Sequence, residues 1–304
     1  MINSIKIGSR KSLLAKTQAR YIAHLIETKL SLRTNLVWIV TSGDKLQRSS
    51  PSLPHEDKGI FIKEIELALR ARTVDIAVHS LKDLPVDIED DFKLAAIPKR
   101  ENPFDAWISK DKTPLDKLKQ GARIGTGSIR RMAFLMNRFP ELEVVPIRGN
   151  VDTRLKKIEI ENLDGVILAA AGIYRLGYDS YITNIIPQDV ILPAPGQGAL
   201  GIETRANDKN LISALSKIND SSTDKVVGLE RQLLKRLGGG CQVPLGIFAR
   251  YDDKDNIILS CEILSKDGKK NVTNSIVFDN HNDSDVILDQ MMIEIDRSGG
   301  LDLL

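Results

Sequence analysis

The chain has 304 residues, 42% of them hydrophobic and 28% charged, with a formal net charge of only +2. This balance predicts a globular protein of two or three domains and excludes nucleic-acid binding through a strongly basic overall field. Two cysteines and short apolar runs exclude a disulfide framework and a membrane-spanning helix, and they favour a cytoplasmic protein.

The first hundred residues alternate short apolar strands with amphipathic helices. The expected elements are strands at Ile5–Gly8, Leu36–Val40 and Val74–Val78, and helices at Leu13–Leu30 and Gly59–Arg72. This alternation is typical of βαβ units on a mostly parallel sheet. Residues 49–58 combine turn residues with charges and lack periodicity, which indicates a mobile loop.

A polar segment at Lys99–Pro103 reads as a linker, after which the alternation starts again. The expected elements are strands at Ala106–Ser109, Arg123–Gly125, Val144–Ile147 and Gly165–Leu168, and helices at Ile129–Arg138 and Val151–Ile160. A second linker, Leu192–Gly198, precedes a strand at Ala199–Thr204. Two linkers around a middle block indicate that the chain leaves the first domain and returns to it, as in hinged folds that bind a ligand in the cleft between two domains.

The pattern changes near Ser221 to a small α+β domain. The expected elements are helices at Lys225–Leu237 and near Val286–Ile295, and strands at Gly246–Tyr251 and Ile257–Leu264. We therefore predict an α/β protein of two hinged domains with a small C-terminal α+β domain. The predicted boundaries are 1–99 with 199–217 for the first domain, 104–193 for the second and 221–304 for the third.

A glycine-rich loop precedes one of the two cysteines. The segment from Leu237 to Gly246 reads LGGGCQVPLG and contains Cys241. Three glycines leave room for a bulky group beside the thiol, and Pro244 fixes the exit of the chain. The pattern predicts either an open loop that presents a reactive thiol or a glycine-rich turn that happens to contain a cysteine.

Two strand-to-helix junctions combine serine with arginine. The first is Gly8–Ser12 and the second is Gly125–Arg131. Backbone N–H groups at a helix start, with hydroxyl and guanidinium groups nearby, favour a phosphate or carboxylate. Four arginines follow successive predicted strands and could converge at the carboxyl ends of the sheet, although solvated surface arginines are the alternative. They are Arg130, Arg131, Arg148 and Arg154.

One acid stands at the end of a predicted strand. Asp83 follows His79 and Lys82 in the segment from Val74 to Pro85. A carboxylate there could stabilise a cation or move a proton, or it could simply cap a turn before the proline. We interpret Asp75 as structural and His79 as a packed, hydrogen-bonded histidine.

Taken together, these segments resemble the hydroxymethylbilane synthase, or porphobilinogen deaminase, family. Seven motifs in order carry the resemblance across nearly the whole chain: IKIGSRKSLLAKTQA, KGIFIKEIE, DIAVHSLKDLP, GTGSIRR, IRGNVDTRL, LPAPGQGALGIE and LGGGCQVPLG. The resemblance implies three domains, the first two like periplasmic binding proteins. It also implies stepwise condensation of four porphobilinogen molecules, each losing ammonia, and hydrolytic release of hydroxymethylbilane.

The resemblance further implies a covalent dipyrromethane cofactor joined to Cys241 by a thioether. It assigns catalysis to Asp83, which would contact pyrrole N–H groups, help to protonate the leaving amine and stabilise a cationic azafulvene. Lys58 and Phe61 match an active-site loop. The family's cofactor- and substrate-binding positions fall on Arg10, Ser12, Lys82, Ser128, Arg130, Arg131, Arg148, Arg154, Arg175 and Gln197. No metal, nucleic acid or membrane partner is expected, and the protein is expected to be a monomer.

Some positions depart from the usual family pattern. Gly127 stands where serine is common, Lys16 replaces an apolar residue, and Glu56 and Asp57 precede Lys58 where glycines are usual.

Two other functions are compatible with parts of the sequence. A non-catalytic solute-binding protein would explain the linkers and the anion site but not the glycine-framed cysteine. A cysteine hydrolase would need a histidine base beside Cys241.

Overall fold

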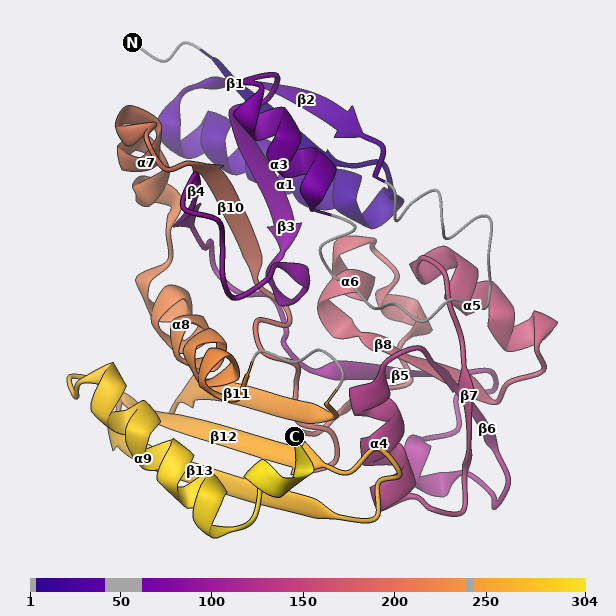
Figure 1. Cartoon of the computed structure of the whole chain (residues 1–304). Coiled ribbons are helices and arrows are strands. Elements are labelled where there is room, and N and C mark those ends of the chain that lie inside the picture. The colour runs from indigo at the N-terminus through magenta and orange to yellow at the C-terminus, as the bar shows by residue number, and fades with distance from the viewer. Residues whose placement is uncertain (1–3, 42–61, 239–242) are drawn as a thin grey trace. The chain divides into compact units, whose positions relative to one another are not determined.

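The computed structural model describes residues 4–41, 62–238 and 243–304. Within this part of the chain, the fold is mixed α/β, with two five-stranded sheets and one three-stranded sheet (Figure 1), and the predicted fold class is confirmed. The chain forms two compact units, one of residues 1–101 with 198–224 and the other of residues 102–197 with 225–304. The three domain boundaries drawn from the sequence stay a prediction.

The first unit is built on the sheet β2-β1-β3-β10-β4. Strands β1 and β2, and β1 and β3, pair in parallel, whereas β10 pairs antiparallel with both β3 and β4. Four of its strands therefore run one way, and β10 brings the returning chain into the middle of the sheet. The strands are β1 (Ser4–Arg10), β2 (Arg33–Ile39), β3 (Ile76–Ser80), β4 (Phe92–Ala96) and β10 (Leu200–Arg205).

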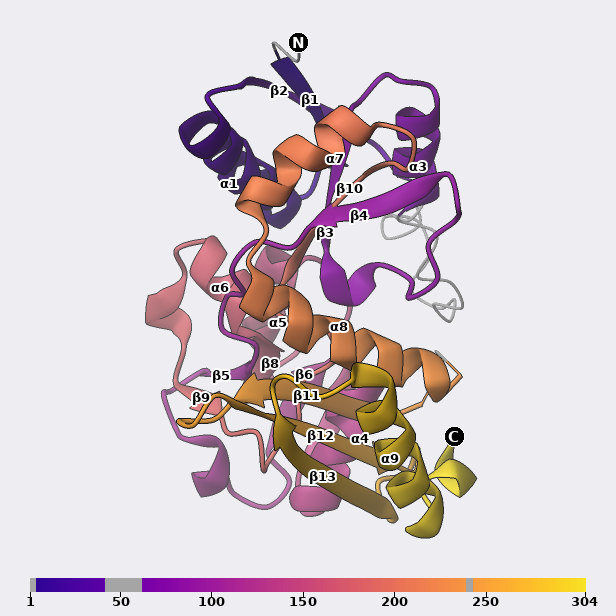
Figure 2. The same ribbon diagram turned by 90° about the vertical axis from the view of Figure 1, so that its left-hand side faces the viewer.

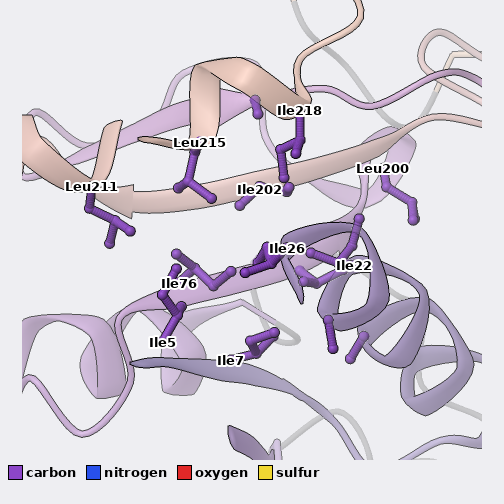
Figure 3. Packing of buried hydrophobic residues seen from close by; sticks show 14 residues of the cluster. Ile5, Ile7, Ile22, Ile26, Ile76, Leu200, Ile202, Leu211, Leu215 and Ile218 are labelled. Atoms are coloured by element: carbon purple, nitrogen blue, oxygen red, sulfur yellow. The ribbon is translucent and has the colours of Figure 1, made fainter. Parts of the chain in front are cut away.

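Helices cover both faces of this sheet. On one face, α1 (Leu13–Leu30) and α7 (Lys209–Leu215) contribute to a buried apolar cluster with the strands (Figure 3). On the other face, α3 (Lys63–Arg70) packs Ile65 and Leu69 against Val74 and Phe92. These two layers fix the ends of β1 and β3, where several predicted site residues lie.

The second unit repeats the strand arrangement of the first. Its sheet runs β7-β6-β8-β5-β9, and β5 is antiparallel to both β8 and β9. Three helices follow β6, β7 and β8 in turn: α4 (Ile129–Arg138), α5 (Val151–Ile160) and α6 (Ala170–Arg175). The strands are β5 (Asp105–Ser109), β6 (Arg123–Thr126), β7 (Glu143–Pro146), β8 (Gly165–Ala169) and β9 (Asn184–Ile186).

The three-stranded antiparallel sheet belongs to the same second unit. It consists of β11 (Leu245–Tyr251), β12 (Asn256–Leu264) and β13 (Asn271–Asp279). The helix α9 (Ser284–Arg297) lies along this sheet (Figure 2) and buries Leu288 and Met291. Phe248 joins the apolar core of the second five-stranded sheet, with its ring 5.5 Å from that of Phe104. The two sheets therefore share one core.

The helix predictions for Leu13–Leu30, Ile129–Arg138 and Val151–Ile160 are confirmed with the same bounds. The sequence analysis missed β4, β9, β13, α6 and α7. It also placed the third strand two residues early, so that His79 lies inside β3 rather than past its end. The final helices were found, although α8 begins earlier, at Ser221–Arg236.

The contact between β5 and β8 predicts a strong effect of adding one methyl group. A Cβ at Gly165 would lie 2.3 Å from the Ile108 carbonyl oxygen and 2.4 Å from the Trp107 ring. The backbone and the buried ring cannot move aside without disturbing the packing of the sheet. We therefore expect Gly165→Ala to lower the free energy of unfolding by about 2–3 kcal/mol, measured by urea titration.

Gly228 provides the matched control for this measurement. It lies within α8, and nothing lies within 4 Å of the position of an added Cβ. Gly228→Ala should therefore raise the free energy of unfolding by about 0.5–1 kcal/mol, because alanine favours a helix. Equal effects of the two substitutions would contradict the packing described for β5 and β8.

Candidate functional site

In the first unit, the predicted site residues lie at the carboxyl ends of two neighbouring strands. Arg10 is the last residue of β1, and Ser12 caps α1 by accepting a hydrogen bond from the Ala15 N–H at 3.3 Å. Lys82 and Asp83 lie in the 3-10 turn η2 (Leu81–Asp83), directly after β3. Since β1 and β3 are parallel neighbours, these four side chains belong to one edge of the sheet, where ligands of α/β folds bind.

The end of β3 is held by buried polar contacts. His79 Nε2 lies 2.9 Å from Glu203 Oε2, and Glu203 is fully buried. Gln18 donates a hydrogen bond from Nε2 to Ser80 Oγ at 2.9 Å. The predicted packed histidine is confirmed, and so is the structural Asp75, whose carboxylate accepts from the Lys6 N–H. The turn that carries Lys82 and Asp83 therefore starts from a fixed strand end.

In the second unit, Arg154 lies beside the loop that opens α4. Its Nε donates to the Gly149 carbonyl at 2.8 Å. A Cβ at Gly127 would lie 3.7 Å from Arg154 Nη2 and only 2.4 Å from the Ile147 carbonyl oxygen. Ser128 caps α4 by accepting from the Arg131 N–H at 3.5 Å. The structure thus gathers Ser128, Arg154 and a helix N-terminus, a combination suited to an anion.

The remaining arginines of this unit differ in exposure. Arg148 follows β7 and is exposed, whereas Arg175 is half-buried at the end of α6. Arg148 belongs to the carboxyl edge of the sheet, because β7 pairs with β6 in parallel, whereas Arg175 follows β8 by one short helix. Arg130 and Arg131 differ from all of these, since both are buried.

Asp105 is a buried partner of these two arginines that the sequence analysis missed. It is fully buried, and its Oδ2 accepts from Arg130 Nη2 at 2.8 Å while its Oδ1 accepts from Arg131 Nη2 at 2.7 Å. Burial alone would raise the pKa of this carboxyl, but the two guanidinium groups outweigh it and hold the pKa well below its usual range. Asp105 is therefore ionised at neutral pH. The sequence held one signal for this contact. Asp105 directly precedes an apolar strand, and the next helix carries the paired arginines.

Gln197 joins the same cluster. Its Nε2 donates to Asp105 Oδ1 at 2.8 Å and to the Pro103 carbonyl at 2.7 Å. The preceding residue is also fixed, because the Gly196 N–H donates to the buried carboxylate of Glu230 at 2.7 Å. The segment predicted as a linker is therefore ordered by two buried acids at this point.

One buried donor of this cluster is unsatisfied among the described residues. Arg131 Nε is buried and has no hydrogen-bond partner. A buried donor without an acceptor is costly, so this atom fits a ligand that brings an oxygen acceptor such as a carboxylate. Lys58, Phe61 and Cys241 lie outside the described residues. No group of side chains suited to a metal ion is present in the described ranges.

Comparison with known families decides the relationship of the chain. Residues 5–213 match "Porphobilinogen deaminase, dipyromethane cofactor binding domain", and residues 225–287 match "Porphobilinogen deaminase, C-terminal domain". The chain belongs to the porphobilinogen deaminase family. Residues 5–213 therefore correspond to the domain that binds the dipyrromethane cofactor in this family.

Individual relatives agree with this family. A porphobilinogen deaminase of Syntrophus aciditrophicus is 48% identical over 246 residues, covering 81% of this chain and 80% of its own. One of Staphylococcus aureus strain Newman is 43% identical over 271 residues, covering 88% of each chain.

Two solved structures are weakly similar to this chain. The periplasmic VFT2 domain of Bordetella pertussis BvgS has a TM-score of 0.42 and 14% identity, covering 75% of this chain and 94% of its own. A periplasmic substrate-binding protein of Coxiella burnetii has a TM-score of 0.43 and 14% identity, covering 73% and 95%. These likenesses carry no functional argument. No helix in the described part of the chain is long and apolar enough to cross a membrane.

Proposed function

We propose that the chain is a hydroxymethylbilane synthase that joins four porphobilinogen molecules head to tail. Each condensation releases ammonia, and water then releases the linear tetrapyrrole. The observation that carries this proposal is the family match over residues 5–213. The geometry supports it, because each pyrrole brings carboxylates and both units present arginines and capping serines at the carboxyl ends of parallel strands.

The dipyrromethane cofactor would be held through a thioether to Cys241, with Ser128, Arg131 and Arg154 binding its carboxylates. When bound, it supplies a fixed primer to which further pyrrole units are joined. Arg131 supports this assignment through its buried Nε, which lacks an acceptor among the described residues. Cys261 is unsuited to the attachment, because burial, with a smaller effect of Glu262, raises the pKa of its thiol to about 12.

Asp83 is the proposed catalytic residue. It is exposed in the turn after β3, so its carboxylate can reach a substrate. A carboxyl oxygen there can hold the proton that the leaving amine takes up and can stabilise the positive charge left on the pyrrole. Lys82 beside it would bind a substrate carboxylate.

The other proposed binding residues are Arg10, Ser12, Arg148, Arg175 and Gln197, and Arg130 serves the site through the Asp105 cluster. Lys58 and Phe61 would belong to an active-site loop. We also propose a cytoplasmic monomer, in keeping with the two cysteines and the balanced charge of the sequence.

The enzyme and a solute-binding protein give different results with one reagent. Incubation with porphobilinogen should consume it, release ammonia and yield hydroxymethylbilane. A protein that binds porphobilinogen without releasing ammonia would contradict the synthase function and support the binding protein.

The first prediction concerns the two cysteines. Cys241→Ser should purify without the chromophore that reacts with Ehrlich's reagent, because the thioether cannot form. Cys261→Ala is the matched control and should keep the chromophore, with a packing cost of about 1 kcal/mol. Full activity of Cys241→Ser would overturn the assignment of the attachment site.

The second prediction concerns the acid. Asp83→Asn should lower kcat by about a hundred- to a thousand-fold while leaving the thermal unfolding midpoint unchanged, because the exposed side chain contributes to charge stabilisation rather than packing. Asp87→Asn, on the same connection to β4, is the control. Normal turnover of Asp83→Asn would remove this residue from the mechanism.

The third prediction separates two arginines of the second unit. Replacing Arg131 with Leu should block acquisition of the cofactor, whereas replacing Arg154 should stall elongation at a later covalent intermediate. Each loss of a charged hydrogen bond to a carboxylate should cost about ten- to a hundred-fold in affinity, and lysine should rescue only partly. Mass spectrometry of covalent intermediates after addition of porphobilinogen reads out the stage. Stalling of both variants at one stage would contradict separate roles.

A further inference from the structure

Arg130 and Arg131 are adjacent in sequence and are held alike through their Nη atoms, but they differ at Nε. Arg130 is anchored at both ends of its guanidinium, with Nη1 donating to the Leu192 carbonyl at 2.5 Å and Nη2 donating to Asp105 Oδ2. Arg131 donates from Nη1 to the Ile167 carbonyl at 3.1 Å and from Nη2 to Asp105 Oδ1. Of these two arginines, Arg131 alone has a buried Nε without a partner among the described residues.

Asp105 accepts from Nη2 of both arginines, and its own position is fixed by the sheet. It is the first residue of β5, which lies between β8 and β9, and its backbone is opposite Ala169 on one side and Ile186 on the other. The sheet therefore fixes the backbone of Asp105, and hydrogen bonds from Arg130, Arg131 and Gln197 hold its carboxylate. A rigid anion that grips Nη2 fixes the plane of the Arg131 guanidinium and hence the direction of its Nε–H.

We propose that Asp105 is a positioning residue that holds Arg131 so that its Nε–H binds one carboxylate of the bound pyrroles, while Arg130 serves as a fixed structural cation. The inference rests on the proposed function, which supplies the pyrrole carboxylates. Gln197 takes part, because it donates to the same Oδ1 and lies 3.4 Å from Arg131 Nη2 through its Oε1. Three chain segments thus orient one guanidinium.

The test compares two isosteric losses of a buried carboxylate in the same unit. Asp105→Asn removes the charge that grips Arg131. Glu262→Gln is the matched control, because Glu262 is also buried and accepts at 2.6 Å from Arg138, which ends the same helix α4. Both proteins are produced in cells that make no porphobilinogen. Circular dichroism then identifies a temperature at which both are folded.

Cofactor formation is followed by intact mass as porphobilinogen is added. The concentration that half-saturates the gain of two rings should rise about ten- to a hundred-fold in Asp105→Asn. It should stay at the wild-type value in Glu262→Gln, although both variants lose stability. Equal half-saturation in Asp105→Asn and the wild type overturns the role of Asp105. A wild type that never gains ring mass instead contradicts the proposed function.

A measurement on the wild type keeps the inference testable if Asp105→Asn does not fold. In ¹⁵N-labelled protein free of rings, the arginine Nε–H resonances are assigned with Arg131→Lys and Arg130→Lys. Adding porphobilinogen should shift the Arg131 Nε–H resonance and leave that of Arg130 in place. If mass spectrometry shows bound rings while the Arg131 resonance stays unchanged, Arg131 does not receive a carboxylate through Nε and the inference is wrong.

Discussion

Two guanidinium groups buried side by side are the constraint on which the second unit depends. Unpaired charges of this kind would destabilise a core severely, and Asp105 offsets part of that cost by accepting from both. The arrangement joins the first strand of the unit, the N-terminal turn of α4 and the segment that carries Gln197. The same contacts leave one arginine donor without an acceptor among the described residues, so in the proposed function packing and ligand recognition share one set of residues.

The sequence could predict those elements whose limits are set locally. The helices α1 and α4 begin after serines that cap them, and their bounds follow from the cap and the apolar period. In contrast, β4, β9 and β13 were missed. Strand β13 alternates exposed and half-buried residues and is stabilised by its pairing with β12, which no local pattern reveals.

The site divides in the same way. Arginines that follow strands could be found from the sequence, because parallel strands bring their carboxyl ends to one edge. The partner of two of them could not be found, since periodicity identifies an apolar strand at Ala106–Ser109 but not which buried acid faces which arginine. Contacts between segments distant in sequence, such as that of His79 with Glu203, cannot be predicted from local sequence patterns for the same reason.

Two departures from the family pattern have structural explanations. At Gly127 an added Cβ would collide with the Ile147 carbonyl oxygen, so the loop before α4 follows a path that only glycine allows here. At Lys16 the ammonium lies 5.5 Å from the centre of the Trp38 ring, within reach of a cation–π interaction. Neither Gly127 nor Lys16 is among the residues proposed to bind carboxylates.

The most direct test of the account is the intact mass of the purified protein before and after porphobilinogen is added. A hydroxymethylbilane synthase should carry an excess mass of two pyrrole rings, gain further rings one at a time, and return to the two-ring form as product is released. A bare polypeptide mass that porphobilinogen leaves unchanged would contradict the proposed function.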